Sequence, residues 1–493
     1  MDYISTRNKN LKVSSAFAIA NGISTEGGLF VPEEIPALSA EDFEALKKLD
    51  YIGRAKAVLS KFLTDFTDSE LEKCLNGAYK NTFDDDCPAP MAKLGDKTHI
   101  LELWHGPTCA FKDLALQLLP YLMTVSAKKV SGGVKTVILV ATSGDTGKAA
   151  LEGFKDVENT EIIVFYPEDG VSAMQKLQMV SQNGNNVHVC AIRGNFDDAQ
   201  SAVKKIFTDE SIIEKLKEKN MKFSSANSIN WGRLAPQIVY YVSAYIDLLN
   251  ENADLSNGFN VTVPTGNFGN ILAAYYAKKM GVPINKLICA SNSNNVLTDF
   301  INSGVYDRNR KFFTTCSPSM DILISSNLER LLFDLCEKDD EYVASLQKSL
   351  SENGKYEVCG AVREKLNKLF FADFCTDEET FETISSVFKE YGYLIDTHTA
   401  VAVNVYKKYL NKTNDNIPAV IASTASPYKF TRSVLSALGE KPKENEFENI
   451  ELLKAVSNTQ IPSPIENLKN AEVRFKEVYN KDELDKAVYN CLM

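Results

Sequence analysis

The feature that most limits the possible folds is an alternation of short apolar runs with segments of helical spacing. From residue 97 onward, near-continuously apolar runs of five or six residues recur, and four of them span residues 136–141, 161–166, 187–192 and 260–264. Turn residues flank each run, as expected for strands that are buried on both faces. Such alternation predicts an α/β protein with largely parallel sheets joined by helices.

The N-terminal part of the chain has a different pattern. Residues 39–59 and 68–79 carry apolar residues at helical spacing, and the stretch Phe83-Asp-Asp-Asp-Cys-Pro-Ala-Pro90 then ends this pattern. Because 493 residues exceed what one hydrophobic core usually serves, we expect two or three domains. Residues 1–92 would form a separate, mainly helical one. The polar helical stretch at residues 336–371 is expected to be a surface insertion without an active-site role.

Composition and charge narrow the possible partners and compartments. A net charge of −11 without any basic cluster argues against nucleic acid, and we expect no membrane partner either. Residues 1–20 mix charged residues with short apolar runs, unlike a signal or transit peptide, so we expect a cytoplasmic protein. The ten cysteines form no Cys-x-x-Cys pair and the four histidines lack the spacing of a zinc site, which predicts reduced thiols and no metal.

Lys112 is the main candidate for chemistry. It follows a tight turn at residues 105–108 and lies at the start of residues 111–119, which have apolar residues at helical spacing. A helix N-terminus and apolar neighbours both disfavour an ammonium group, so they should lower the lysine pKa and provide a neutral, nucleophilic amine. Without its context, the same lysine is more typical of a surface residue whose stem covers an apolar helix face.

Two glycine-containing loops lie between a predicted strand and a predicted helix. Residues 141–150 place hydroxyls and backbone N–H groups around a hollow that suits a carboxylate, with a simple turn as the alternative. This loop is not a Walker A motif, because Ala149 stands where that motif needs Ser or Thr. In residues 263–272, Gly266 and Gly269 allow the backbone to close around a phosphate, while the third glycine of a dinucleotide fingerprint is missing.

A third polar segment, residues 224–237, is rich in asparagine. Asn227 and Asn230 precede Arg233 ahead of a predicted helix. Fixed amide donors and one guanidinium suit a phosphate dianion, because arginine makes bidentate, charge-assisted contacts to it. We therefore predict a site for a substrate phosphate, with ordinary turn residues and a surface cation as the alternative.

Several of these blocks resemble threonine synthases, which are pyridoxal-phosphate (PLP) enzymes of fold type II. The stretch His105-Gly-Pro-Thr-Cys-Ala-Phe-Lys-Asp113 is similar to the cofactor-lysine motif of that family, and further similar blocks extend from residue 3 to beyond residue 430. The sequence departs from the frequent family pattern at Asn8, where Gly is common, and at Ser426, where His is common.

The resemblance implies an α/β fold of type II, with two largely parallel-sheet α/β domains beside a mainly helical N-terminal domain. Residues 1–92 would be the N-terminal domain. Residues 93–124 and 221–493 would form the large PLP-binding domain, and residues 125–220 a small domain inserted into it. The cofactor would lie between these two α/β domains.

The resemblance also implies a set of site residues. Lys112 would be the catalytic residue and would bind PLP covalently. The other PLP-binding residues would be Gly266, Asn267, Phe268, Gly269, Asn270 and Thr424, with the Thr424 hydroxyl as partner of the pyridine nitrogen. The substrate carboxylate would contact Thr142, Ser143 and Thr146, and the substrate phosphate would contact Asn227, Asn230 and Arg233. Asp145, in the same loop as Thr142, would also be a substrate-binding residue. For His398, a catalytic role and a place in the core stay open.

The implied activity is the PLP-dependent conversion of O-phospho-L-homoserine and water to L-threonine and phosphate, the last step of threonine biosynthesis. A phospho-lyase that releases a 2-oxo acid is the alternative within the same class, and a binding protein without catalysis is the alternative outside it. The expected partner is the small-molecule substrate. We expect a monomer, with a dimer as the alternative.

Overall fold

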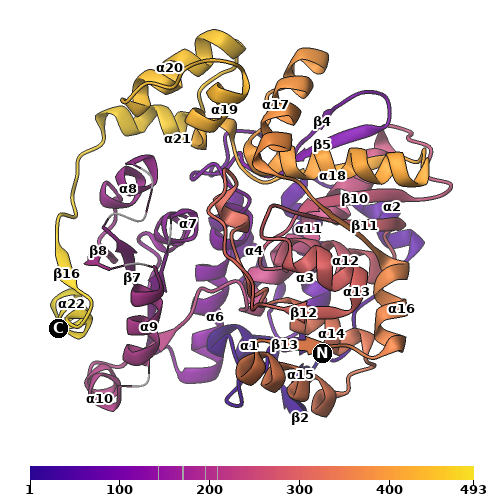
Figure 1. Cartoon of the computed structure of the whole chain (residues 1–493). Helices are drawn as coiled ribbons and strands as arrows, with labels where there is room; N and C mark the ends of the chain where they lie inside the picture. Colours follow the sequence, from indigo (N-terminus) through magenta and orange to yellow (C-terminus); the bar gives the residue numbers. More distant parts are fainter. Residues whose placement is uncertain (143, 169–170, 172, 195, 208, 493) are drawn as a thin grey trace.

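The first eighty residues contain a small antiparallel sheet and the helices α1 to α4, which are labelled in Figure 1. The computed structural model describes residues 1–492 except 143, 169–170, 172, 195 and 208. In the sheet, β1 (Tyr3–Ser5) pairs with β2 (Asn8–Val13) and β3 (Phe30–Pro32) on either side. The helices are α1 (Ser15–Asn21), α2 (Ala40–Leu46), α3 (Tyr51–Phe62) and α4 (Asp68–Tyr79). This sheet was not predicted from the sequence.

The segment at residues 39–59, predicted to be helical throughout, contains two separate helices, α2 and α3. The prediction of one continuous helix was therefore wrong. The side chain of Asp50 accepts a hydrogen bond from the backbone N–H of Gly53 and caps the start of α3. An N-cap residue has extended backbone geometry, which interrupts a helix that would otherwise run on. The helix predicted at residues 68–79 is confirmed as α4, which begins with a capping box between Thr67 and Glu70.

The larger sheet has six strands in the order β14-β11-β10-β15-β5-β4, all parallel except β4. Its strands are β4 (Met91–Lys93), β5 (Thr98–Glu102), β10 (Phe259–Pro264), β11 (Ile284–Ser291), β14 (Phe370–Phe374) and β15 (Ala419–Ser423). The segment at residues 336–371 was predicted to be a surface insertion, which is wrong at its end. Phe370 and Ala372 are buried and pack in the core, because they face inward on an edge strand of this sheet.

Both faces of the larger sheet are covered by helices. Val261 and Leu287 lie in the same core cluster as α11 (Trp231–Asn250) and α12 (Gly269–Lys279), whereas Ile288 and Ile421 pack with α18 (Thr397–Thr413). This alternation follows from the two-residue period of a strand, and it explains the continuously apolar runs. The other elements of this part are α5 (Lys112–Leu116), α6 (Leu119–Ser131), α13 (Val296–Ser303), β12 (Val305–Asp307), α14 (Leu328–Leu335), α15 (Asp340–Asn353), β13 (Lys355–Glu357), α16 (Gly360–Leu369), α17 (Asp377–Tyr391), α19 (Thr431–Ala437), α20 (Glu446–Ser457) and α21 (Ser463–Glu466).

The smaller sheet has five parallel strands in the order β16-β8-β7-β6-β9. Its strands are β6 (Lys135–Ala141), β7 (Thr160–Pro167), β8 (Val187–Arg193), β9 (Met221–Ser224) and β16 (Val478–Asn480). Val137 and Leu139 pack with α9 (Phe196–Phe207), α10 (Glu210–Glu218) and α22 (Leu484–Leu492), while Ile138 and Val140 pack toward α7 (Asp145–Phe154) and α8 (Ala173–Val180). The predicted strands at 136–141, 161–166 and 187–192 are confirmed.

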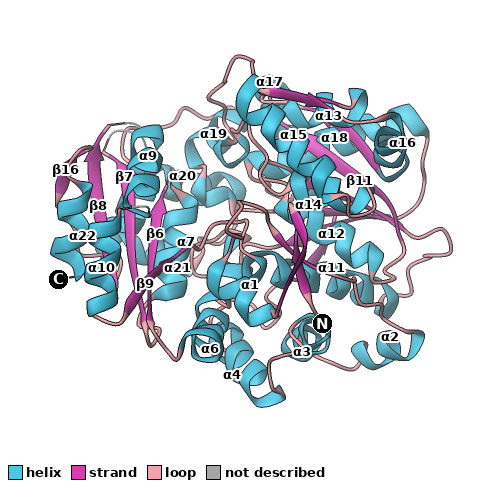
Figure 2. Ribbon diagram, turned by 90° about the horizontal axis from the view of Figure 1, so that it is seen from below, coloured by secondary structure: helices cyan, strands magenta, loops and turns pink. Residues whose placement is uncertain are grey.

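The end of the described chain returns to the smaller sheet. After α21, residues 471–477 run down one side of the molecule to β16, which pairs with β8 and forms the outer edge of the sheet (Figures 1 and 2). The expected division placed residues 221–493 in the large domain, but β9 and β16 hydrogen-bond within the smaller sheet. We therefore propose that the small α/β domain also includes residues 221–224 and 478–492.

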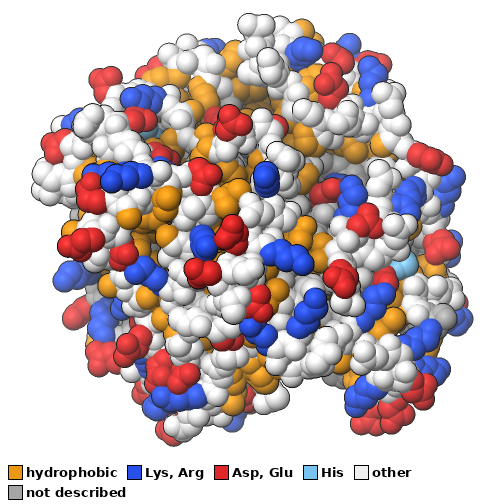
Figure 3. All heavy atoms as spheres, turned by 180° about the vertical axis from the view of Figure 1, so that it is seen from behind, with side chains coloured by type: hydrophobic (Ala, Val, Ile, Leu, Met, Phe, Trp, Pro, Cys, Tyr) orange, Lys and Arg blue, Asp and Glu red, His pale blue; other side chains and the backbone are white. Residues whose placement is uncertain are grey.

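On the face shown in Figure 3, Lys and Arg side chains are interspersed with Asp and Glu side chains. Of the helices that the structure describes, none has both the length and the apolar character needed to cross a membrane.

Candidate active site

Lys112 is the first residue of α5, as predicted. Its side chain is 13% exposed, and the pKa of its amine is lowered to about 8. Burial is the main cause; Asp145 opposes the lowering, while the positive charges of Lys429 and Arg233 add to it. The predicted direction of the pKa shift is confirmed, with burial rather than the helix start as its main origin.

Asp145, the first residue of α7, places a buried carboxylate beside this amine. Its Oδ2 lies 3.8 Å from Nζ of Lys112, and its Oδ1 lies 2.8 Å from Nζ of Lys429. Burial alone would raise the pKa of Asp145, but the two lysines hold it well below its usual value. The carboxylate is therefore ionised at neutral pH, and its closer partner is Lys429.

The loop before Lys112 is tied to the segment that follows β15. The backbone N–H of Phe111 donates to the carbonyl of Thr424 at 2.9 Å, and Nζ of Lys429 donates to the carbonyl of Thr108 at 2.8 Å. Strands β5 and β15 are parallel neighbours, so the loops at their carboxyl ends meet at one edge of the sheet. Thr424 is buried and adjoins the residue before Lys112.

Ser426, where the family often has His, has a local structural role. Its side-chain oxygen accepts a hydrogen bond from the backbone N–H of Tyr428, and its own N–H donates to the carbonyl of Cys109. Ser426 thereby caps the short 3-10 helix η2 (Pro427–Lys429). The capped turn fixes where the Lys429 side chain begins.

The loop between β10 and α12 is a close backbone turn. Phe268 has a φ of 65°, in the left-handed region, and the first turn of α12 has no side-chain cap. A Cβ added at Gly266 would lie 3.0 Å from the carbonyl oxygen of Ser319, whereas one added at Gly269 would lie no closer than 3.4 Å to Asn327. The close approach thus requires glycine at position 266 more strictly than at 269, a difference that the sequence did not indicate.

Asn270, in the first turn of α12, carries an unsatisfied donor. Its Oδ1 accepts hydrogen bonds from the hydroxyls of Tyr240 at 2.7 Å and Tyr241 at 2.5 Å. Its Nδ2 is buried and has no hydrogen-bond partner among the described residues. An unpaired buried donor costs about 1–3 kcal/mol, which a bound anion would recover. Asn267, in contrast, is exposed.

These features fit PLP. The uncapped N-terminus of α12 and the unpaired amide of Asn270 suit a phosphate group, because both offer N–H donors at the positive end of a helix dipole. The amine of Lys112 suits an aldehyde, because burial lowers its pKa to about 8 and makes the neutral amine accessible. The residues therefore match a phosphorylated aldehyde at both of its functional groups.

The loop at the start of α7 is shaped by Thr142. Its hydroxyl accepts hydrogen bonds from the backbone N–H groups of Gly144 and Gly147, each at 3.0 Å, and the side chain is buried. This hydroxyl therefore holds the loop in shape. Thr146 is partly exposed, and Ser143 lies outside the residues that the structure describes.

Arg233 is a buried cation without a matching anion. Its Nη1 donates to the carbonyl of Ala226 at 2.6 Å, while its Nε is buried and unpaired. The ion pairs found among the described residues include none with Arg233. Burial lowers the pKa of its guanidinium to about 10. The charge is close enough to Lys112 to lower the pKa of that amine, so this region suits an anionic ligand.

The two asparagines expected beside Arg233 differ in their surroundings. Asn230 is buried; its Nδ2 donates to the carbonyl of Ile19 and its Oδ1 accepts from the N–H of Gly232. Asn230 therefore caps α11, and its amide is already hydrogen-bonded within the protein. Asn227 is exposed. Of the three predicted phosphate contacts, Arg233 is the one with buried, unused donor capacity.

His398 has partners on both ring nitrogens. Its Nδ1 lies 2.8 Å from Oδ2 of Asp396, and its Nε2 accepts from the backbone N–H of Ser319 at 3.1 Å. The Ser319 hydroxyl in turn donates to Oδ2 of Asp145 at 3.2 Å. His398 thus holds the backbone that approaches both Asp145 and Gly266, which favours a supporting place in the core.

Sequence reasoning missed Lys429 and Ser319. A signal for Lys429 was present, because this lysine stands between the aromatic residues Tyr428 and Phe430, which is unusual for a solvated side chain. Ser319 has no comparable signal. Its role depends on where residues far apart in the chain come together.

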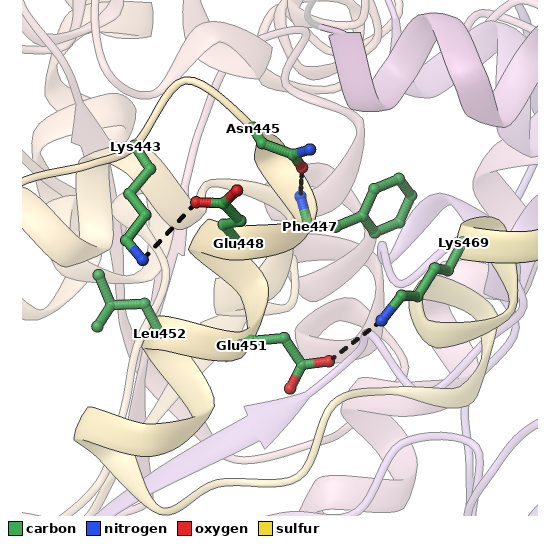
Figure 4. Close-up of a pocket in the computed structure, with 7 residues that line it drawn as sticks. All are labelled: Lys443, Asn445, Phe447, Glu448, Glu451, Leu452 and Lys469. Atoms are coloured by element: carbon green, nitrogen blue, oxygen red, sulfur yellow. Dashed lines mark hydrogen bonds and ion pairs between the residues drawn. The ribbon is translucent and has the colours of Figure 1, made fainter.

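Metal sites and other pockets would be the remaining candidates for function in the described chain. No group of three His, Cys, Asp or Glu side chains with the arrangement of a metal site occurs in the described part of the chain. A surface pocket of about 350 Å³ lies at α20 (Figure 4), where Lys443 pairs with Glu448 and Lys469 pairs with Glu451. None of the residues lining it is a candidate site residue.

Three family models match successive parts of the chain. Residues 2–79 match the N terminus of threonine synthase, residues 86–359 match pyridoxal-phosphate dependent enzymes, and residues 399–488 match the C-terminal part of threonine synthase. The second match contains Lys112, the β10–α12 turn and Arg233, so it covers most of the site described above.

Known relatives agree with these matches. The chain is 42% identical to human "Threonine synthase-like 1" over 92% of its own length and 62% of that protein, and it is therefore shorter than that relative. It is 39% identical to a threonine synthase of Pseudomonas aeruginosa, over 90% of this chain and 92% of the other. A crystal structure of PLP-bound threonine synthase from Brucella melitensis superposes with a TM-score of 0.89 at 36% identity, covering 100% of this chain and 99% of that one. PLP is the cofactor, and the chain belongs to the threonine synthase family of PLP-dependent enzymes.

Proposed function

We propose that this chain converts O-phospho-L-homoserine and water to L-threonine and inorganic phosphate. The observation that carries the proposal is Arg233, a buried guanidinium with an unpaired Nε. Its positive charge lies near enough to Lys112 to lower the pKa of that amine. A buried cation without a protein anion is unfavourable, because its desolvation is not offset by an ion pair. A substrate that brings its own dianion to the vicinity of Lys112 would offset it.

Lys112 is the proposed catalytic residue. PLP, when bound, supplies an electron sink that stabilises negative charge on the substrate α-carbon. An amine with a pKa of about 8 is partly neutral at physiological pH, so Lys112 can accept the α-proton and can return protons to neighbouring carbons. Thr424 is the proposed hydroxyl partner of the pyridine nitrogen.

The proposed PLP phosphate contacts are the backbone N–H groups of residues 266–270 and the side-chain amide of Asn270. Asn270 is supported by its unpaired buried Nδ2. For the substrate carboxylate we propose the loop at residues 142–146, in which Thr142 holds the backbone in place and the N–H groups and the Thr146 hydroxyl make the contacts. In this assignment Asn230 acts through the cap of α11 and not by direct contact.

Incubation of the PLP-loaded protein with O-phospho-L-homoserine tests the proposal. We expect threonine and phosphate to appear in equal amounts, and K112A to release neither. Phosphate accompanied by a 2-oxo acid in place of threonine would instead identify the phospho-lyase alternative. Absence of phosphate release by the folded, PLP-loaded protein would refute both activities.

A further inference from the structure

The carboxylate of Asp145 lies between two lysines at unequal distances. The Lys429 ammonium lies 2.8 Å from Oδ1, and the Lys112 amine lies 3.8 Å from Oδ2. Both the Lys429 side chain, 2% exposed, and the Asp145 side chain, 4% exposed, are shielded from water. Lys429 therefore makes the direct ion pair, and Lys112 makes a weaker contact with the same group.

Lys429 is held in this position by contacts on several sides. Its Nζ also donates to the carbonyl of Thr108, in the loop that leads to Lys112, and its chain begins in the turn capped by Ser426. Asp145 likewise accepts from Ser319 on Oδ2 and from Gln175 on Oδ1. The pair is thus a fixed part of the loop packing, and neither side chain has to reorganise to make it.

The protonation of the Lys112 amine depends on both members of this pair. The groups acting on its amine are Asp145 from α7, Lys429 from η2, Arg233 from α11 and Asp113 from its own helix. Of these, Asp145 is the main group that favours the protonated amine, and Lys429 is the main charged group that opposes it. An isolated Asp145 beside Lys112 would form a buried ion pair, which stabilises the ammonium and blocks its reaction with an aldehyde.

We propose that Lys429 is a positioning residue that keeps the Asp145 carboxylate engaged and thereby leaves the Lys112 amine free to react. This inference rests on the proposed function only in taking Lys112 as the lysine that binds PLP. It does not depend on the identity of the substrate. Asp145 would then orient the amine through a long contact without trapping its proton.

The test is the rate of PLP binding as a function of pH in the full-length protein after PLP has been removed. In that step the Lys112 amine adds to the aldehyde carbon of PLP and the aldehyde oxygen leaves as water, so the rate follows the neutral fraction of the amine. The parent should show an apparent pKa of about 8. K429M should raise it by about one unit, which lowers the rate at pH 7 about tenfold.

The double variant D145N/K429M separates this mechanism from a packing effect. Without the carboxylate, the ammonium of Lys112 loses its stabilising partner, so the apparent pKa should fall back below that of K429M and PLP binding at pH 7 should recover. K148M is the matched control, because Lys148 is a buried lysine of α7 that pairs with Glu152 and is not among the groups that act on the Lys112 amine. It should leave the pH profile unchanged.

Several outcomes would overturn the inference. If K429M folds but binds PLP more slowly by the same factor at every pH, Lys429 has only a packing role. The same conclusion follows if D145N/K429M shows no recovery. Should K429M not fold, K429Q keeps a donor for Thr108 and must show the same upward shift. A shifted profile in a protein that releases no phosphate from phosphohomoserine would support the inference while refuting the proposed function.

Discussion

Replacing Arg233 by Met should make the unliganded protein more stable and the enzyme less active. Burial lowers the pKa of the Arg233 guanidinium from its ordinary value to about 10, and this corresponds to roughly 3 kcal/mol of destabilisation by the desolvated charge. The variant also loses the charge-assisted hydrogen bond to the carbonyl of Ala226, a loss of about 1.5–3 kcal/mol. The free energy of unfolding should therefore rise by up to about 1.5 kcal/mol in R233M.

The effect on catalysis should have the opposite sign. A charge-assisted contact with the substrate phosphate contributes about 1.5–3 kcal/mol, so kcat/KM should fall by roughly one to two decades, and inhibition by inorganic phosphate should weaken. Urea unfolding of the PLP-free protein and steady-state kinetics measure the two effects. R54M is the control, because Arg54 is a buried arginine paired with Asp247 at 2.6 Å; it should lose stability and keep kcat/KM. A destabilised R233M with normal kcat/KM would refute the reasoning.

Three further predictions follow from single contacts. Borohydride reduction of the PLP-loaded protein should attach PLP permanently to Lys112. If peptide mapping found the reduced PLP on another lysine, Lys112 would not be the PLP-binding lysine. G266V should weaken PLP affinity at least tenfold because its side chain meets the backbone of Ser319, whereas G269A should bind PLP nearly as the parent does; equal effects would contradict the geometry. Although burial opposes it, pairing with Asp84 and Glu102 raises the pKa of His105 to about 9. The stabilisation from this pairing is fully present below about pH 6.5 and is lost as pH rises through about 9. Between pH 6.5 and pH 9.5, the free energy of unfolding measured with urea should therefore fall by about 2–3 kcal/mol more in the parent than in H105Q.

The fold was predictable where the pattern is local. The strands at residues 136–141, 161–166 and 187–192 have apolar side chains on both faces because helices cover both faces of the sheet, and this leaves a clear trace in the sequence. The three-residue strands β1, β3 and β16 leave no such trace, since three residues are too few to show a period. Their pairing depends on partners elsewhere in the chain.

The candidate loops could be predicted from the sequence more easily than the contacts of their side chains. Glycines, hydroxyls and amides mark where a backbone turns around an anion, and Arg233 became a candidate through the asparagine-rich segment before it. Lys112 became a candidate through the turn and the apolar helix start around it. Sequence spacing does not say which polar groups are already satisfied. Thr142 and Asn230 use their hydrogen-bonding groups within the protein, whereas Asn270 retains a free donor, and this distinction follows from tertiary contacts alone.

The position of β16 has a consequence for synthesis of the protein. The strand that closes the outer edge of the smaller sheet is made long after its neighbour: β8 ends at residue 193 and β16 begins at residue 478. At about 5–20 residues per second, the ribosome needs roughly 15–60 s to cover that interval. During this time β8 is an edge strand with unpaired backbone groups, which invites pairing with other chains. The nascent chain should therefore be most prone to aggregate, and most in need of chaperones, before residues 478–480 emerge.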